Sequence, residues 1–299
     1  MNRIVKAQVA GLFTALFWGY SFVWTSQVLN FFNPMSIVFM RLVIALCILI
    51  PLVYFIKMRQ RVTKKQLGQL AVLALFQPFL YFIFETYGVK LTTSTVSSVI
   101  ISMIPLMVPV GSFLVYKERL TPINAVGIAV SFAGVALIIF DRAVDFSGGL
   151  LGIGVLFLAV LTAVVYMMII RRMSGQFNIF TINVYQNFFG LLYFLPFFLF
   201  DGLPVLLEID FNQVWILPLV ALAVFGSTAA FLLYTYSIGV LGPSKAAAFN
   251  NLIPVVTAVA AYWHFAESIT FQKSVGIAIV ITGLYLAQKQ VKRGFVARG

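Results

Sequence analysis

The chain has 299 residues, of which 62% are hydrophobic and 9% are charged, and its formal net charge is +12. A soluble domain carries roughly 25% charged residues, so this composition excludes a water-soluble fold and indicates a protein surrounded by lipid. The basic residues are spread through short polar segments, which excludes nucleic-acid binding as their purpose. The single cysteine, Cys47, gives no disulfide framework and no cysteine metal site, and we expect it to be buried in the second apolar stretch.

Apolar stretches of about 20 residues follow one another along the chain, bounded by charged residues or by Pro and Gly. A stretch of that length crosses the hydrocarbon core as a helix, because a backbone in lipid must satisfy its own hydrogen bonds. We therefore expect an all-α integral membrane protein with ten transmembrane helices. In chain order they cover residues 7–28, 34–56, 66–87, 93–115, 121–140, 149–170, 177–200, 212–238, 244–265 and 271–288.

The short segments between the predicted helices alternate in charge. Most Lys and Arg residues fall on one side of the membrane, whereas acidic residues such as Asp141, Asp201 and Glu208 fall on the other. Cytoplasmic loops carry an excess of Lys and Arg. We therefore expect both termini to lie in the cytoplasm.

The second half of the chain repeats the first. A shift of 149 residues brings matching residues together without a gap, namely Thr86 and Thr235, Tyr87 and Tyr236, Pro105 and Pro254, Glu118 and Glu267, Gly127 and Gly276, and Gly134 and Gly283. Five helices per copy is an odd number, so the second copy must cross the membrane in the opposite direction. The sequence thus predicts two inverted repeats, residues 1–145 and 146–299, with a substrate site between them.

Two segments carry a resemblance to a known family. Residues 97–137 (SSVIISMIPLMVPVGSFLVYKERLTPINAVGIAVSFAGVAL) and residues 246–286 (AAAFNNLIPVVTAVAAYWHFAESITFQKSVGIAIVITGLYL) resemble the two repeats of the EamA family within the drug/metabolite transporter superfamily. The shared features are a proline inside a helix, a Glu thirteen residues later, and two glycines seven apart in the next helix. Arg41 also fits the pattern of the family.

The resemblance implies ten helices in two five-helix repeats and transport of amino acids, other small metabolites or drugs. It also implies efflux across the bacterial inner membrane. The second copy departs from the pattern in its first helices. There the register shifts to an offset of about 145 residues, and Gln186 stands where the first copy has Arg41.

Arg41 and Glu85 are the two charged side chains that lie well inside the predicted helices. A charge at the centre of a membrane helix costs about 2.5–3.5 kcal/mol on insertion scales, so such residues face protein or water. Both are candidate substrate-binding residues, and Glu85 is the candidate proton carrier. The alternative is a structural ion pair between the second and third helices. Either way, we expect Arg41 and Glu85 to approach within salt-bridge distance in at least one state of the protein.

Gln77, Tyr81 and Glu85 recur every four residues and share one face of the third predicted helix. This polar stripe predicts one wall of a substrate cavity; the alternative is a hydrogen-bonded seam between helices. The matching positions in the second copy are Gly226, Ala230 and Tyr234. Because these residues are less polar, we expect a cavity with charge on its first-half side and aromatic surface on the other.

The fourth and ninth predicted helices each contain a proline near polar residues. Asn250 and Asn251 precede Pro254, and the carbonyl freed by a proline together with two amides could bind a substrate or merely satisfy the kink. Pro105 is the matching residue in the first half. We expect Pro105 and Pro254 to act as hinges, and Trp18 in the first helix to line the cavity.

These features favour a secondary transporter of a small metabolite that works by alternating access. A flippase for lipids or lipid-linked groups is an alternative, and an integral-membrane transferase is a remote one, because the chain has one His and no paired acidic motif. We expect no catalytic residue, no metal and no cofactor. The expected partners are a small-molecule substrate and the bilayer. A proton gradient and facilitated transport both remain open as the driving force, and a monomer and a homodimer as the assembly.

Overall fold

The computed structural model describes residues 3–117, 122–140, 149–173, 176–211, 213–241 and 248–288, and over these residues the chain is helical with no β-strand. Glu118, which the repeat pairs with Glu267, lies outside the described residues. In the first half the helices are α1 (Arg3–Val28), α2 (Pro34–Phe55), α3 (Lys64–Ala74), η1 (Leu75–Leu80), α4 (Tyr81–Leu91), α5 (Ser94–Ile101), α6 (Ile104–Tyr116) and α7 (Pro122–Ile139).

The second half follows the same order of long and interrupted helices. Its helices are α8 (Gly149–Arg172), α9 (Ile179–Phe197), η2 (Phe198–Gly202), α10 (Leu203–Glu208), α11 (Gln213–Ala221), η3 (Leu222–Ala229), α12 (Ala230–Leu241), η4 (Ala248–Leu252), α14 (Ile253–Phe265) and α15 (Phe271–Gln288). In the part of the chain that the structure describes, each predicted transmembrane range overlaps helical structure. Contiguous helical runs that are long and apolar enough to cross a membrane cover Pro34–Phe55, Lys64–Leu91, Ser94–Tyr116, Gly149–Ile170, Ile179–Glu208 and Val214–Tyr234.

The bilayer-facing surface of these helices is apolar. Tyr54, Phe200 and Leu217 are each more than 60% exposed, as expected where lipid replaces water. Cys47 is also exposed on α2, so the prediction that it is buried was wrong. Position 47 faces away from the neighbouring helices, whereas Leu46 and Leu49 pack inward. The protein is a multi-pass membrane protein.

Helices at corresponding places in the two halves begin and end in the same way. Asn33 and Asn178 cap α2 and α9, and the Oδ1 atom of each accepts a hydrogen bond from a backbone N–H three residues on. Lys117 and Ala266 end α6 and α14 in the left-handed conformation, with φ angles of 58° and 51°. The local signals that define a helix are therefore repeated, although the residues that carry them differ.

The third helix of each half is interrupted near its middle. The two π-helical segments, η1 at Leu75–Leu80 and η3 at Leu222–Ala229, overlap when the sequence is shifted by 149 residues. In η1, Pro78 supplies no backbone donor and Gln77 leaves the helical conformation, with φ −143° and ψ 117°. Extra residues in a helical turn leave carbonyl groups that side chains can reach.

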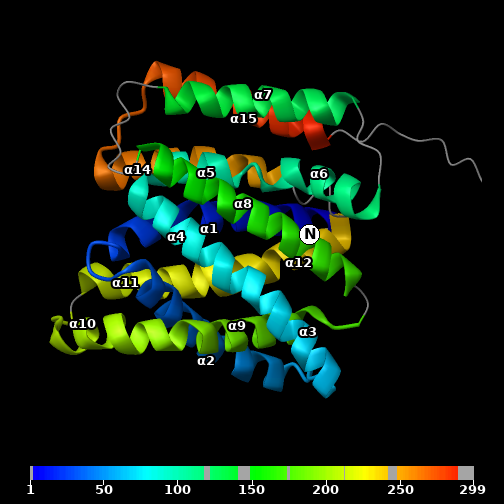
Figure 1. Ribbon diagram of the computed structural model, residues 1–299, viewed down its shortest axis with the longest axis vertical. Coiled ribbons are helices and arrows are strands. Elements are labelled where there is room, and N and C mark those ends of the chain that lie inside the picture. Colours follow the sequence, from blue (N-terminus) through cyan, green and yellow to red (C-terminus); the bar gives the residue numbers. More distant parts are fainter. Residues whose placement is uncertain are drawn as a thin grey trace, which may run out of the picture.

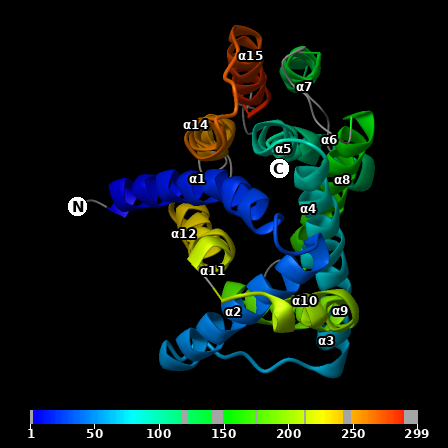
Figure 2. The same cartoon turned by 90° about the vertical axis from the view of Figure 1, so that its left-hand side faces the viewer.

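The fifth helices, α7 and α15, pack on each other at one end of the molecule (Figures 1 and 2). A Cβ atom added at Gly134 would lie 2.8 Å from the carbonyl oxygen of Gly276, and one added at Gly283 would lie 2.6 Å from that of Gly127. Glycine therefore permits an approach that any larger residue would prevent. Helices α2, α3, α9 and α10 lie at the opposite end of the molecule, and helices such as α1, α4 and α12 lie between (Figure 2).

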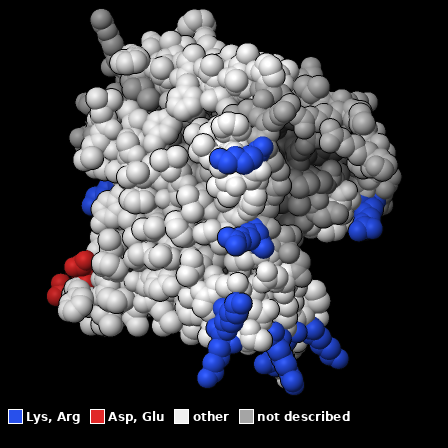
Figure 3. Space-filling model, turned by 45° about the vertical axis from the view of Figure 1, so that its right-hand side comes forward, with Lys and Arg blue, Asp and Glu red and all other residues white. Residues whose placement is uncertain are grey.

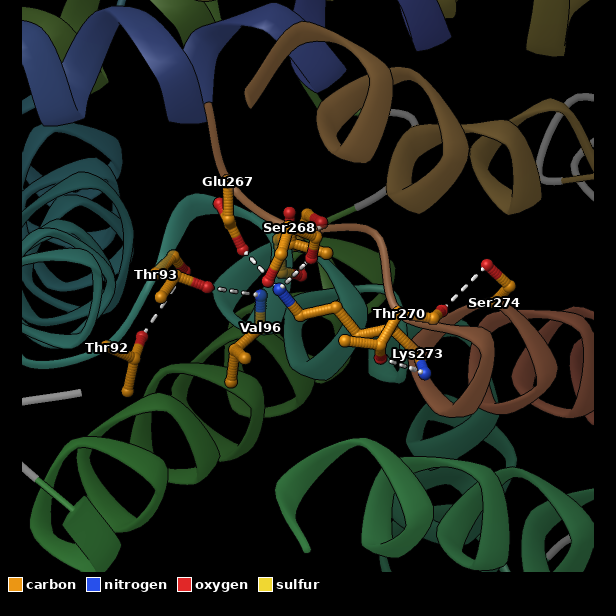
Figure 4. A network of polar contacts seen from close by, with 10 residues as sticks. Thr92, Thr93, Val96, Glu267, Ser268, Thr270, Lys273 and Ser274 are labelled. Carbon is orange, nitrogen blue, oxygen red and sulfur yellow. Dashed lines mark hydrogen bonds and ion pairs between the residues drawn. The ribbon is translucent and has the colours of Figure 1, made fainter. Parts of the chain in front are cut away.

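A polar network holds the α14–α15 connection (Figure 4). Lys273 is 3% exposed, and its ammonium group donates hydrogen bonds of 3.0 Å to Glu267 Oε1 and to the carbonyl of Ser268. This ion pair satisfies a buried charge and fixes the start of α15. Elsewhere the visible acidic side chains lie at one edge of the molecule, and most visible Lys and Arg side chains lie away from that edge (Figure 3).

Candidate functional site

A small cavity lies between the two halves of the described chain. Its internal volume of about 30 Å³ has room for roughly two water molecules. It is lined by Gln77, Pro78, Phe82, Tyr166, Asn183, Gln186, Asn187, Ser227 and Phe231. The walls are therefore built from η1 and α4 in the first half and from α8, α9, η3 and α12 in the second.

Gln186 on α9 forms hydrogen bonds with two other parts of the cavity wall. Its Nε2 donates a 2.7 Å hydrogen bond to the carbonyl of Gln77, which the break in η1 exposes. Its Oε1 accepts a 3.3 Å hydrogen bond from the Tyr166 hydroxyl. Gly190, one turn further along α9, has no side chain and lets Pro78 pack against the helix. The amide of Gln186 is thus engaged on both sides.

Arg41 on α2 makes the corresponding contact from the first half to the second. Its Nε donates a 2.9 Å hydrogen bond to the Ser227 hydroxyl in η3. The guanidinium carbon lies 4.2 Å from the centre of the Phe82 ring, which is a cation–π distance. Arg41 is 4% exposed, so it stands behind Ser227 and Phe82, both of which line the cavity.

Glu85 accepts a 2.9 Å hydrogen bond from the Tyr81 hydroxyl, four residues earlier on the same helix. The two members of the predicted stripe therefore meet as their spacing indicates. Glu85 and Arg41 attract each other, but no direct ion pair joins them in this conformation of the described chain. The expected salt bridge between them stays a prediction for another state.

A second group consists of two aromatic residues, Trp18 and Tyr234, and the amide of Asn250. We call it the aromatic group. The rings of Trp18 and Tyr234 lie 5.0 Å apart, and the Trp18 ring also lies 5.3 Å from that of Phe231, which lines the cavity. Asn250 Nδ2 donates a 3.4 Å hydrogen bond to the Tyr234 hydroxyl, whereas its buried Oδ1 has no donor among the described residues. Asn251 is 8% exposed and lies beside Asn250 in η4.

The predicted binding residues therefore lie in three places. Gln77 lines the cavity directly; Arg41 and the Tyr81–Glu85 pair lie next to Phe82, and the aromatic group lies next to Phe231. The two charged residues, Arg41 and Glu85, belong to the first half but do not line the cavity, and aromatic residues line it from both halves, with Phe82 in the first and Tyr166 and Phe231 in the second. The predicted hinges, Pro105 and Pro254, each occupy the second position of a helix, α6 and α14, that follows a break.

Two cavity residues on α9, Asn183 and Asn187, were missed in the sequence. They are spaced four residues apart, with Gln186 between them on the same face, which is the spacing that identifies the stripe on α4. The same search applied to the seventh predicted helix finds them.

Among the described residues there is no group of three His, Cys, Asp or Glu side chains that could hold a metal ion.

Comparison with known proteins places the chain among transporters. The model of the EamA-like transporter family matches residues 5–140 and 150–288. An uncharacterized transporter of Archaeoglobus fulgidus is 26% identical over 91% of this chain and 94% of that relative. The uncharacterized transporter YetK of Bacillus subtilis is 27% identical over 83% of this chain and 76% of its own length. A protein of known crystal structure shares the fold, with a TM-score of 0.68 at 18% identity over 94% of this chain and 96% of that one.

Proposed function

The chain belongs to the EamA-like transporter family, and we propose that it exports a small polar metabolite, an amino acid or a related compound, by alternating access. The observation that carries this proposal is the polar cavity between the halves. Amide and hydroxyl groups are costly inside an apolar bundle, and here they converge from both halves on one space. A carrier needs such a site, because each half must contact the substrate when the other half moves.

The proposed architecture is ten transmembrane helices in two inverted repeats, residues 1–145 and 146–299. Reciprocal contacts between α7 and α15 support it. Gly134 approaches Gly276, and Gly283 approaches Gly127; the shift of 149 residues converts one contact into the other. Contacts that exchange in this way are expected of two copies related by a twofold axis.

In the proposed cycle, the breaks before Pro105 and Pro254 are the hinges. Helices α5 and α6 would bend against each other in one half, and η4 and α14 in the other. The cavity of about 30 Å³ would represent a contracted state that widens when one side opens. We propose that both termini lie in the cytoplasm, because the basic segments lie on their side, and that the membrane is the bacterial inner membrane, as the family resemblance implies. Glu85 would carry the proton if transport uses a proton gradient.

The test of function is counterflow in liposomes. Purified protein is reconstituted into vesicles loaded with one unlabelled amino acid or related metabolite at millimolar concentration, and uptake of the same labelled compound is measured with and without a pH gradient. We expect uptake above that of protein-free vesicles for at least one compound. Movement of a labelled lipid between leaflets, without counterflow of any soluble compound, would instead identify a flippase.

The test of topology is cysteine labelling in a Cys47→Ser background. Asn2→Cys and Val205→Cys should react with an impermeant maleimide from opposite sides of the membrane. Labelling of both positions from the same side would contradict the inverted repeat.

A further inference from the structure

Basic residues are concentrated where α2 leads into α3. Five of the nine residues in 57–65 are Lys or Arg and none is acidic, whereas no other segment between the predicted transmembrane ranges holds more than two basic residues. The matching segment of the second half, between α9 and α11, instead holds Asp201, Glu208 and Asp210 with no Lys or Arg. The concentration of charge is therefore a property of this one segment and not of the repeat. We call its five members the basic cluster: Lys57, Arg59, Arg61, Lys64 and Lys65.

The positive charges of the basic cluster are not balanced by the protein around them. All five side chains are exposed, and no ion pair in the described part of the chain includes any of them. Lys64 and Lys65 are the first two residues of α3, where the helix dipole is positive and a cation is unfavourable. An anion from outside the chain would relieve both the mutual repulsion of the cluster and its conflict with the dipole.

Apolar side chains border the basic cluster. Tyr54 and Phe55, at the end of α2, are 64% and 77% exposed, and the guanidinium carbon of Arg59 lies 5.8 Å from the centre of the Tyr54 ring. The cluster joins two helical runs that can each cross a membrane, so it lies at a membrane surface. Lys and Arg side chains project from the lower end of the molecule in Figure 3, where Figure 1 places the end of α2 and the start of α3. Cationic side chains beside exposed aromatic rings are typical of the depth at which lipid head groups meet acyl chains.

The backbone that carries the basic cluster is fixed by the second half of the chain. Gln60 Nε2 donates a 2.7 Å hydrogen bond to the carbonyl of Gln176, and Gln60 Oε1 accepts a 2.9 Å hydrogen bond from the backbone N–H of Asn178. Asn178 Nδ2 in turn donates a 3.1 Å hydrogen bond to the carbonyl of Met58. Both sequence neighbours of Gln60 are arginines of the cluster. A fixed backbone reduces the ordering that these side chains must undergo when they bind a ligand.

We propose that the basic cluster binds the head groups of anionic phospholipids. Clusters of about four to eight Lys and Arg next to a membrane helix attract anionic lipids, with a contribution from each residue, and guanidinium groups match the oxygens of a phosphate. The exposed aromatic end of α2 offers a surface to the acyl chains, which a soluble anion or an acidic protein would leave unused. This surface lies outside the substrate cavity and would act whichever compound is transported.

The first test uses the full-length wild-type protein in a neutral detergent. Its melting temperature is measured in mixed micelles with phosphatidylglycerol or with phosphatidylcholine of the same acyl chains. A ligand that binds the folded protein stabilises it, so we expect a higher melting temperature with phosphatidylglycerol. The difference should shrink in about 0.5 M NaCl, because salt screens exposed charges.

Three results of this test would overturn the proposal. The first is an equal melting temperature with the two lipids. The second is equal stabilisation by glycerol 3-phosphate, a soluble anion without acyl chains. The third is equal stabilisation by poly-glutamate, which would identify an acidic polypeptide as a sufficient partner.

Substitutions assign the lipid effect to the basic cluster. Arg61→Gln/Lys64→Gln/Lys65→Gln removes three charges, whereas Arg61→Lys/Lys64→Arg/Lys65→Arg keeps them at the same positions. Native mass spectrometry measures how much phosphatidylglycerol each variant retains. We expect the Gln variant to bind phosphatidylglycerol at least about tenfold more weakly than the wild-type protein, and the charge-preserving variant to stay within about twofold.

The matched control removes three exposed charges elsewhere, in Arg3→Gln/Lys6→Gln/Arg172→Gln. It should retain the lipid as the wild-type protein does. If it loses as much lipid as the Gln variant of the cluster, or if the Gln and charge-preserving variants behave alike, the cluster is not the lipid site.

The stability of the Gln variant without anionic lipid completes the test. In phosphatidylcholine it should melt no lower than the wild-type protein, because two cations have left the positive end of α3. A lower melting temperature would show that the fold itself needs these charges, and would overturn their assignment to lipid. None of these measurements involves transport, so their failure leaves the proposed carrier standing, and a failure of counterflow leaves the lipid surface standing.

Discussion

The two interrupted helices, η1 and η3, hold the same place in the two halves but are built from different chemistry. In η1 a proline removes a donor and a neutral amide from α9 satisfies the freed carbonyl of Gln77. In η3 there is no proline. Ser227 and Thr228 instead donate to carbonyls five residues back, and the Ser227 hydroxyl accepts from a charged guanidinium on α2.

The two contacts are reciprocal. Arg41 and Gln186 correspond at an offset of 145 residues, and their partners lie one position apart at an offset of 149, where Gln77 corresponds to Gly226, the neighbour of Ser227. The second helix of each half therefore reaches the broken third helix of the other half. Both halves therefore keep a hydrogen bond between the second helix of one half and the third helix of the other, but only the bond of Arg41 carries a charge.

The largest expected effect comes from removing the carboxylate of Glu85 while the guanidinium of Arg41 stays buried. Glu85→Gln leaves the buried guanidinium of Arg41 without a carboxylate to offset its charge. Because no direct ion pair joins the two residues in this conformation, the expected cost is at most the roughly 3 kcal/mol of a broken buried pair. The double variant Arg41→Gln/Glu85→Gln removes both charges and should be more stable than Glu85→Gln. The free energy of unfolding in mixed micelles measures both. Additive costs of the two single substitutions would show that the residues never interact.

The second effect concerns coupling to protons. If transport is coupled, Glu85→Gln should abolish the response of uptake to an imposed pH gradient while counterflow continues, because the amide cannot carry a proton. The assay is made at a temperature at which the variant remains folded. Proton-driven accumulation by the Gln variant would exclude Glu85 as the carrier. Wild-type protein that shows no gradient response is a facilitator, and Glu85 is then a substrate ligand or the counter-ion of Arg41.

The third effect tests the uncharged hydrogen bond from Gln186 to the Gln77 carbonyl. Gln186→Leu keeps the size of the side chain but leaves the Gln77 carbonyl without its donor, which costs about 1–2 kcal/mol for a buried polar group. We expect lower stability in micelles, with Phe188→Leu as the matched control on the same helix. Equal stability of the two variants would mean that the break in η1 does not depend on α9.

The helices could be predicted from the sequence because the length of an apolar stretch is a local signal. The matching positions in the two halves could be predicted because the same Pro, Gly and Asn residues recur in both. The stripe Tyr81–Glu85 could be predicted for the same reason, since its hydrogen bond spans four residues of one helix. The partners of Arg41 and Gln186 could not. They lie 186 and 109 residues away in the chain, and one of them is a backbone carbonyl, which leaves no mark in the sequence.

Asn183 and Asn187 were missed for a different reason. Their spacing is a local signal, but the comparison of the two copies singles out Gln186 alone, because it stands where the first copy has Arg41. The pairing of Nδ2 atoms with helix carbonyls, which decides what the side chains can bind, depends on rotamers that spacing does not specify. The sequence therefore predicts which face of a helix is polar, and the structure shows which atoms on that face are hydrogen-bonded within the protein.

The smallest expected effect separates the two hydroxyls of η3. Ser227→Ala removes a hydroxyl that both donates to Leu222 and accepts from Arg41, and should cost about 1 kcal/mol. Thr228→Val removes only the bond to the Ala223 carbonyl and keeps the packing, so its cost should be about 0.5 kcal/mol. Unfolding in mixed micelles distinguishes the two values when both variants are measured beside the wild-type protein.

Because Arg41 reaches η3 through Ser227 alone among the described hydrogen bonds, Ser227→Ala should also weaken the coupling between Arg41 and the rest of η3. The combination of Ser227→Ala with Arg41→Gln should then cost less than the sum of its parts. Additive costs would show that η3 keeps its shape without α2, and that the charged link, unlike the neutral one, serves the substrate rather than the fold.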